Sequence, residues 1–382
     1  MEIKVIKSFD EFEALKDKWN LALKKSSSNL FFLRHEWLLN WWKHYGRGHD
    51  LFVILVIHDG EIAAAAPMMI LNKKLFRIIK VRKLQFIAHD VSDYMDFMIV
   101  SDHAANFNRL MAQIKSSSSL WDWAEFIYLK NDSSNLKYWR NIGADVNDMV
   151  FDKKDVSVIV NIGAHDSYDK YLRSLNKKVR HDVTRQMNNI EKTAKIKFDV
   201  YKNSNEILSL LPNFFSLHKK KWKDQKMASQ FYDRALTERY TSLAKDLDDT
   251  GLLELSVLRL DNNIVAMHYG FTYEDRYYWY TPTYNPEYAK YSPGKLLLAK
   301  LIENAISRRF KIFDLLRGNE QYKYFWTKDQ QDLYGVIMLN RNISSRIKVF
   351  MSKSLKEMLL KTIIGRTYSR IKTTSNLIKK ES

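Results

Sequence analysis

The amino-acid sequence predicts an α/β (α+β) protein made of two similar halves, each with a mixed, mainly antiparallel sheet flanked by helices. Apolar stretches with strand spacing alternate with amphipathic helical stretches, and the same order of elements recurs in both halves. In each half two neighbouring strands are joined by a tight-turn sequence, Asp-Gly at 59–60 and Asp-Asn-Asn at 261–263. We place the halves at residues 1–150 and 151–340, followed by a tail at 341–382.

The first half is expected to begin with two helices. Ser8 and Glu11 have the spacing of a capping box, which predicts a helix over 8–26. A second helix, rich in tryptophan, is expected over 33–45. The remaining elements are strands at 51–59, 61–71, 84–90 and 95–100, a helix at 104–116 and a strand at 123–130.

The second half is expected to open on a strand at 156–162. A long basic helix from Tyr168 to Lys192 follows, and then two helices near 204–221 and 229–246. The rest consists of strands at 252–261, 263–273, 275–284, 310–316 and 332–340, with one helix from Pro293 to Arg308. No sequence repeat relates the halves, so only the order of their elements suggests two related folds.

Composition excludes several classes of site. Of 382 residues, 46% are hydrophobic and 28% charged, so sizeable cores are expected. The absence of cysteine excludes disulfides, iron–sulfur clusters, cysteine-bound zinc and a thiol nucleophile. We find no P-loop, no G-x-S-x-G elbow and no metal-ligand spacing. The chain also has no apolar run of membrane-spanning length, and its N-terminus lacks the apolar core of a secretion signal, so we expect a cytoplasmic protein.

The net charge is +18, and half of it lies in the tail, where eleven Lys/Arg and two Glu give 11 − 2 = +9. A basic balance favours anionic partners, namely phosphate groups, an acidic membrane surface or nucleic acid. Met351, Leu355, Leu359 and Ile363 share one stripe of an expected basic helix. Such a helix suits peripheral contact with an anionic membrane, and docking on the protein itself or on a partner complex is the alternative.

Four blocks of sequence carry a family resemblance. They are FFLRHEWLLNWWKHYG at 31–46, LNKKVRHDVTRQMNNIEK at 175–192, the Ser-Pro-Gly loop at 292–294, and FDLLRGNEQYKYFW at 313–326. Together they resemble GNAT-superfamily acyltransferases, in the branch of CelD-type proteins of cellulose biosynthesis. The resemblance implies two tandem GNAT-like folds related to FemAB-type transferases. It also implies acyl transfer from a thioester, usually acyl-coenzyme A, to an amine or hydroxyl.

Ser292, Gly294 and Lys295 are candidate donor-binding residues at the start of the helix from Pro293. Serine is a favourable N-cap, and proline already has helical φ at the first position. Gly294 would let a ligand approach the backbone, where free N–H groups favour a pyrophosphate, as in the GNAT coenzyme A loop. The loop has one glycine where the superfamily loop usually has more, and a simple well-capped helix is the alternative.

Asp314 lies in an otherwise apolar strand, where a carboxylate is costly unless it is paired or functional. Attack of an amine on a thioester needs a base for the amine proton and a donor for the departing thiolate. We therefore assign Asp314 or Glu320 as base and Tyr322 as proton donor. Arg317 and Lys323 are candidate substrate contacts, and a structural ion pair at Asp314 is the alternative.

Further candidates lie elsewhere in the chain. His268, in the strand 263–273, would suit a base if it faces the cleft, and is otherwise a core histidine. Lys178 and Arg180 are candidate phosphate contacts or solvated cations of the basic helix. Asp93 belongs to a polar turn, Asp-Tyr-Met-Asp, that resembles the same family and could border an acceptor cleft. The basic-aromatic cluster 218–222 could stack on a sugar or nucleotide, and plain helix surface is the alternative.

The sequence thus predicts an N- or O-acyltransferase with acyl-coenzyme A or another acyl-thioester as cosubstrate, and with no metal or tightly bound cofactor. The expected acceptor is an amino-sugar or other glycan precursor of the cell envelope. Aminoacyl transfer from aminoacyl-tRNA, as in FemAB-type enzymes, is one alternative. The other is a non-catalytic GNAT-like subunit of a glycan-synthesis complex. Nucleic acid other than tRNA is not expected, and the inner face of the membrane is a second expected location beside the cytoplasm.

Overall fold

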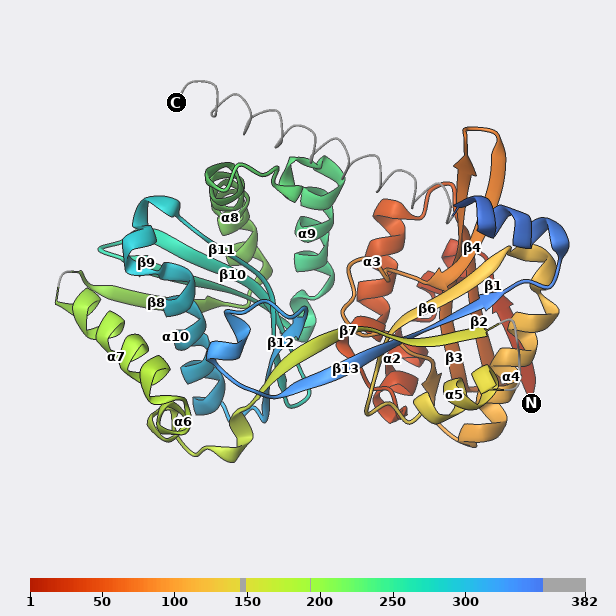
Figure 1. Ribbon diagram of the computed structural model, residues 1–382, viewed down its shortest axis with the longest axis horizontal. Helices are drawn as coiled ribbons and strands as arrows, with labels where there is room; N and C mark the ends of the chain where they lie inside the picture. Colours follow the sequence, from red (N-terminus) through yellow and green to blue (C-terminus); the bar gives the residue numbers. More distant parts are fainter. Residues whose placement is uncertain (145–148, 193, 353–382) are drawn as a thin grey trace, which may run out of the picture.

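A single mixed sheet of 13 strands runs through the molecule and carries helices on both faces (Figure 1). The computed structural model describes residues 1–144, 149–192 and 194–352. Across the sheet the strands follow the order β1 (Glu2–Ile6), β2 (Asp50–His58), β3 (Glu61–Leu75), β4 (Ile79–Phe86), β6 (Trp123–Lys130), β13 (Gln330–Leu339), β7 (Met149–Asn161), β12 (Ile312–Arg317), β11 (Arg276–Tyr284), β10 (Asn263–Tyr273), β9 (Leu253–Leu260) and β8 (Ile196–Tyr201), and β5 (Met98–Ile99) pairs with β3. The predicted α/β class is confirmed.

The helices divide between the two halves of this sheet. Those of the first half are α1 (Phe9–Glu13), α2 (Lys16–Lys25), α3 (His35–Tyr45), α4 (His103–Ser116) and α5 (Leu136–Ala144). Those of the second half are α6 (Tyr168–Ser174), α7 (Lys177–Glu191), α8 (Ser204–Asp224), α9 (Arg234–Asp246) and α10 (Pro293–Ser307). Residues 343–352 form a further helix. No helix in the described ranges is long and apolar enough to cross a membrane.

Two hydrophobic cores lie on opposite faces of the second half. The larger core joins the first half to α8 and α9, and α9 packs directly on α3. The smaller core lies beneath α6, α7 and α10 on the other face. Because α8 and α9 share their core with the first half, the two halves bury apolar surface against each other, which is the main stabilising contribution to such a contact.

Strands β7 and β13 cross the centre of the molecule and tie the halves together (Figure 1). β13 comes from the end of the second half, yet it pairs antiparallel with β6 of the first half from Leu333↔Lys130 to Leu339↔Trp123. On its other edge it pairs with β7 from Gln330↔Val158 to Met338↔Met149. The boundary expected at 150 falls inside β7, so the sheet is continuous there; the division into 1–150 and 151–340 stays a prediction.

Three expected elements differ in the structure. The helix over 8–26 is two helices separated by a turn at 14–15, and the Ser8 side chain makes no capping hydrogen bond. The basic helix over 168–192 is broken at Leu175, because the Asn176 side chain accepts a hydrogen bond from the Lys178 backbone N–H and starts a new helix there. The strand expected at 95–100 shortens to β5. The reason is that the Asp96 carboxylate accepts a hydrogen bond from the backbone N–H of Phe97.

Other local predictions are confirmed. The turn at Asp59 and Gly60 has left-handed φ angles of 52° and 79°, as a two-residue hairpin turn requires. The helix expected from Pro293 and the strand at 123–130 are α10 and β6. The stripe expected at Met351, Leu355, Leu359 and Ile363 falls, apart from Met351, outside the described residues, as does most of the tail 341–382.

Candidate active site

Strands β11 and β12 separate midway along their length. They run parallel and form three pairs, from Arg276↔Ile312 to Tyr278↔Asp314. Beyond this point β12 shifts its register against β7, and Leu316 takes a left-handed φ of 63°. A cavity of about 500 Å³ lies between the diverging strands, and residues 90–93 of the first half form another of its walls. We call it the strand cavity.

The strand cavity is lined by aromatic and charged side chains from both halves. They include Trp222, Tyr240, Trp279, Tyr280, Asp90, Asp93, Lys221, Arg317, Glu320, Tyr322 and Lys323. Five of the residues predicted from the sequence therefore share one cavity, namely Asp93, Arg317, Glu320, Tyr322 and Lys323. Asp314 and His268 are not among its lining residues.

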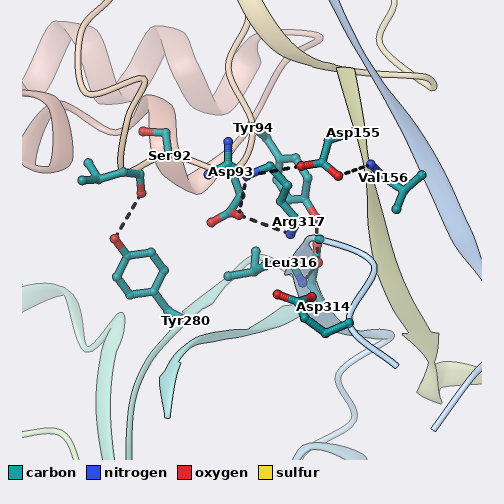
Figure 2. Close-up of polar contacts among 12 residues, drawn as sticks. Ser92, Asp93, Tyr94, Asp155, Val156, Tyr280, Asp314, Leu316 and Arg317 are labelled. Atoms are coloured by element: carbon teal, nitrogen blue, oxygen red, sulfur yellow. Dashed lines mark hydrogen bonds and ion pairs between the residues drawn. The ribbon is translucent and has the colours of Figure 1, made fainter. Parts of the chain in front are cut away.

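Asp93 and Arg317 meet across the junction of the two halves (Figure 2). The Asp93 carboxylate accepts a hydrogen bond from the Arg317 backbone N–H at 3.2 Å and lies 3.7 Å from its Nε. The guanidinium also lies 4.0 Å from Asp155 and 3.8 Å above the ring of Tyr128. Burial raises the pKa of Asp93 to about 6, against the opposing effect of Arg317. The cavity thus holds a carboxylate that changes its charge near neutral pH.

Asp314 lies below this pair in the view of Figure 2 and connects the same two halves through Tyr94. It has no exposed surface, and its carboxylate accepts hydrogen bonds from the Tyr94 hydroxyl at 2.7 Å and from the Leu316 backbone N–H at 2.9 Å. The guanidinium of Arg276 lies 3.7 Å from its other oxygen. Burial raises the pKa of Asp314. The alternative explanation, a structural ion pair, describes these surroundings better than a base that meets substrate.

Lys323 is buried, and its ammonium group closes the turn after β12. Its Nζ donates hydrogen bonds to the carbonyl oxygens of Leu316, Arg317 and Gly318 at 3.2, 2.6 and 3.2 Å. Glu320 lies 2.8 Å from the same atom. An ammonium has three N–H donors, so none is left for a ligand. The structure gives Lys323 a structural role where the sequence predicted an anion contact, and it pairs Glu320 with this lysine.

Tyr322 and His268 both contact the indole of Trp279. The Trp279 N–H donates to the Tyr322 hydroxyl at 3.2 Å, and burial raises the pKa of Tyr322 to about 12, so its phenol keeps its proton. The ring of His268 stacks on Trp279 at 4.3 Å, and its Nε2 accepts the backbone N–H of Tyr280 at 3.0 Å. Burial lowers the pKa of His268 to about 3. His268 is therefore a neutral core residue that supports the cavity wall.

The basic-aromatic cluster 218–222 divides between cavity and surface. His218, Lys221 and Trp222 line the strand cavity. Trp222 donates its indole N–H to His218 Nε2 at 2.9 Å, and the other ring nitrogen contacts the Ser229 hydroxyl at 2.8 Å. Burial lowers the pKa of Lys221. This end of α8 therefore brings a cation and an aromatic face into the cavity.

A second cavity, of about 530 Å³, lies between α7 and the start of α10, and we call it the helix pocket. Its lining includes Lys178, His181, Arg185, Lys295, Phe325 and Trp326. Lys295 forms an ion pair with Asp182 at 2.6 Å. Arg180 is not in the lining and donates to the carbonyl of Arg173 instead. The segment 322–326 borders both cavities, because Tyr322 and Lys323 line the first and Phe325 and Trp326 the second.

The start of α10 departs from the expected N-cap. Ser292 occupies the N-cap position with left-handed angles (φ 48°, ψ 54°), and its side chain makes no capping hydrogen bond to the described residues. A Cβ atom on Gly294 would meet only the ring of Tyr284, at 3.5 Å. Packing within the chain therefore does not require glycine at 294, whereas close approach of a ligand to this backbone would.

Part of the sequence that forms these two cavities matches a known protein family. Residues 177–324 match the family model described as an acetyltransferase (GNAT) domain, a range that includes α7, α10, β11, β12 and the segment through Tyr322. The second half thus contains a GNAT-type acetyltransferase domain.

No curated protein matches the sequence. Among the described residues, no three histidine or acidic side chains converge to hold a metal ion.

Several solved structures have a similar fold. FemX is 12% identical with a TM-score of 0.58, covering 89% of this chain and 98% of that one. The C-terminal domain of an Agrobacterium fabrum protein described as a lysylphosphatidylglycerol synthetase is 11% identical with a TM-score of 0.56, covering 91% and 98%. A protein of unknown function from Bacteroides thetaiotaomicron is 11% identical with a TM-score of 0.51, covering 88% and 100%. Each likeness spans nearly the whole of both chains, so it concerns the two-part fold.

Sequence reasoning missed the aromatic walls of the strand cavity. Trp279, Tyr280 and Tyr240 lie in apolar strand and helix patterns that also describe core residues. The turn at 93–96 offered a usable signal, since Asp93 and Tyr94 both contact the block at 313–326. The sequence predicted that this turn borders an acceptor cleft. It gave no sign that the Asp93 carboxylate has a pKa near neutrality.

Proposed function

We propose that the protein is an acyltransferase that moves an acyl group from a thioester donor to an amino or hydroxyl group held in the strand cavity. The observation that carries this proposal is the divergence of β11 and β12 around a cavity that contains a carboxylate with a pKa near 6 and a protonated phenol. Acyl transfer needs one group of each kind.

The proposed step assigns one proton to each group. The acceptor nitrogen or oxygen attacks the carbonyl carbon of the thioester, and its proton passes to the Asp93 carboxylate. The carbon–sulfur bond then breaks, and the departing thiolate takes the proton of the Tyr322 hydroxyl. Asp93 replaces Asp314, which does not line the cavity, and Glu320, which is paired with Lys323. Asp93 borders the cavity and has a pKa matched to a base at neutral pH.

The helix pocket is the proposed site for the phosphate groups of the donor. Lys178, Arg185 and Lys295 surround it, and the N-terminus of α10 adds the positive end of a helix dipole. Gly294 leaves room for phosphate oxygens to approach the backbone. Because the segment 322–326 borders both cavities, a donor whose phosphates lie in the helix pocket would direct its thioester past Tyr322. Coenzyme A has this extended form, and it acts here as a cosubstrate.

The acceptor we propose is an amino-sugar or related glycan precursor, as in CelD-type proteins of envelope polysaccharide pathways. Trp222, Trp279 and Tyr280 offer flat apolar faces on which a sugar ring can pack, and Lys221 and Arg317 offer charge-assisted donors to its polar groups. A small apolar acceptor would leave the partly buried Lys221 ammonium without a polar partner, so a polar acceptor suits the cavity better.

One experiment tests this proposal directly. The purified protein is given acetyl-coenzyme A with a panel of amino-sugars, and release of free thiol is measured. We expect acceptor-dependent release that is lost in Asp93→Asn. Release that persists in Asp93→Asn would overturn the assignment of the base. No release with any acyl-thioester, including acyl-carrier protein, would favour the non-catalytic alternative.

A second candidate is aminoacyl transfer from aminoacyl-tRNA. The fold shared with FemX and the cations of α7, among them Lys177, Lys178 and Arg185, favour it. Binding to a tRNA backbone would weaken steeply as salt rises, because each phosphate contact releases counterions. Retention of labelled tRNA at low salt, lost in Lys178→Ala, is the expected result for this function. Thiol release from acyl-coenzyme A with no tRNA binding would exclude it.

A further inference from the structure

The hairpin of β3 and β4 extends beyond the rest of the sheet. The last pair of β3 with β2 is Ile70↔Asp50, and the first pair of β4 with β6 is Lys83↔Trp123. Of the strand residues between these pairs, Asn72 and Arg82 at the base hydrogen-bond to residues 48–50 and to Asp122. The others pair with each other across the hairpin, and Figure 1 shows the ribbon projecting from the first half. A lone two-stranded ribbon gains little stability from burial. We call residues 71–82 the ribbon.

The tip of the ribbon holds apolar side chains in an unfavourable backbone conformation. The Ile78 backbone N–H donates to the carbonyl of Leu75, and the two central residues, Phe76 and Arg77, have left-handed φ angles of 50° and 64°. Asparagine and glycine adopt these angles easily, whereas a bulky phenylalanine does not. Phe76 and Ile78 are also 55% and 84% exposed. Neither turn geometry nor core packing explains why Phe76 and Ile78 occupy the tip of the ribbon.

A second apolar feature lies beside the ribbon. In the helix at 343–352, Ile343, Ile347 and Phe350 are 75%, 55% and 72% exposed, and their spacing places them on one stripe. Buried Asp122 fixes this helix against the ribbon. Its carboxylate accepts the Arg82 backbone N–H at 2.8 Å and the Lys348 ammonium at 3.0 Å. The two apolar features therefore belong to one end of the molecule (Figure 1).

The surroundings of these side chains are strongly basic. Residues 71–83 and 341–352 contain nine Lys/Arg and no Asp or Glu. The four cations nearest the tip are exposed and have no ion pair among the described residues: Lys73, Lys74, Arg77 and Lys80. Protruding apolar side chains among unpaired cations match a bilayer that offers acyl chains beneath anionic headgroups. A nucleic acid would use the cations and leave the apolar side chains in water.

We propose that the ribbon and the helix at 343–352 form one surface that binds an anionic lipid bilayer. The apolar side chains of Phe76, Ile78, Ile347 and Phe350 enter the headgroup region, and the lysines and arginines contact lipid phosphates. The surface lies in the first half and the helix after β13, and it shares no residue with the strand cavity. It therefore does not depend on the proposed acyl transfer.

Sedimentation of the full chain with vesicles tests this proposal. Vesicles of phosphatidylcholine alone are compared with vesicles of equal parts phosphatidylcholine and phosphatidylglycerol. We expect binding to the anionic vesicles only, weakened by salt. The double variant Phe76→Ser with Ile78→Ser should lower the partition coefficient at least about tenfold, because two apolar side chains no longer leave water. Ile347→Ser with Phe350→Ser should act in the same direction.

A matched control removes two exposed apolar side chains elsewhere. Met227→Ser with Tyr232→Ser, at positions 58% and 64% exposed in the second half, should bind vesicles as the unaltered protein does. All four positions of the test variants are exposed, so their thermal unfolding should match that of the control. Unchanged vesicle binding in both test variants would overturn the proposal. An equal loss of vesicle binding in the control variant would overturn it too. So would a protein that binds RNA and not vesicles, and whose RNA binding is unchanged in both test variants.

Discussion

The strand cavity and the helix pocket have similar volumes but are built on different principles. In the strand cavity Asp93 is held by Arg317 from the other half, and Lys323 is held by three carbonyl oxygens of its own segment. In the helix pocket the cations stand on helix surfaces, and Lys295 pairs with a partly exposed Asp182. Groups held rigidly suit chemistry, because they need no reorganisation during reaction. Cations on the surface of two helices suit the binding of a flexible anion.

The pKa values follow the same division. Burial raises the pKa of Asp93 to about 6 and that of Tyr322 to about 12 in the strand cavity. In the helix pocket the hydrogen bond from Lys295 lowers the pKa of Asp182, which keeps this carboxylate charged. Substitutions in the strand cavity should therefore change rate or stability, whereas those in the helix pocket should change donor binding.

The largest expected effect is that of Asp93→Asn on the rate of acyl transfer. Loss of the base should lower kcat about 100-fold or more. In the unaltered protein kcat/KM should rise with pH through about 6, because the carboxylate accepts a proton only when charged, and Asp93→Asn should lack this rise. Steady-state thiol release between pH 5 and 8 measures both.

His268→Gln is the control for that pH dependence. His268 loses its proton well below pH 5, since burial lowers its pKa to about 3, so the rise near 6 should stay. A rise that disappears in His268→Gln and remains in Asp93→Asn would assign the base to the histidine.

Lys323→Met should cause the next largest effect, a loss of stability. The variant leaves the carbonyl oxygens after β12 without their shared donor, at a cost of about 3 kcal/mol in the free energy of unfolding. Urea denaturation measures it. Lys328→Met, at an exposed position in the same segment, is the control and should change stability by less than about 0.5 kcal/mol. Equal losses in the two variants would contradict the structural role of Lys323.

Tyr94→Phe should destabilise the protein by about 2 kcal/mol, because it removes the hydroxyl that satisfies buried Asp314. The hydroxyl also joins the two halves, so the loss should be seen in the free energy of unfolding measured by urea. Tyr324→Phe removes an exposed hydroxyl that donates to Gln330 and should have little effect. A stable Tyr94→Phe would show that Asp314 finds another partner.

The smallest expected effect belongs to the helix pocket. Lys295→Ala should raise KM for acyl-coenzyme A about 3- to 10-fold, equivalent to about 1 kcal/mol, with kcat nearly unchanged. Lys300→Ala, on the same helix and outside the pocket, should leave KM unaltered. A fall in kcat without a change in KM would show that Lys295 acts in the chemical step and not in donor binding.

Local features of the fold could be predicted from the sequence, and long-range partners could not. Turn chemistry at Asp59 and Gly60 and apolar periodicity in α10 depend on neighbouring residues, so the sequence contains them directly. The block 313–326 was found because a carboxylate in an apolar strand is unusual. Its partner Tyr94 lies 220 residues away, and no local pattern names such a partner.

The orientation of His268 was beyond sequence analysis for a different reason. Both faces of β10 are buried over most of its length, so the alternation that distinguishes core from cleft is missing there. The role of Asp93 needed the structure as well, because its pKa depends on burial between two halves that the sequence treats separately.

The position of β13 between β6 and β7 has a consequence for the order in which the protein forms during synthesis. The ribosome completes β6 at Lys130, but the strand that covers its free edge ends only at Leu339. The first half therefore carries an unpaired central edge until nearly the whole chain has emerged. A nascent chain stopped before Gln330 should thus be more sensitive to protease in the first half than a chain extended past Leu339.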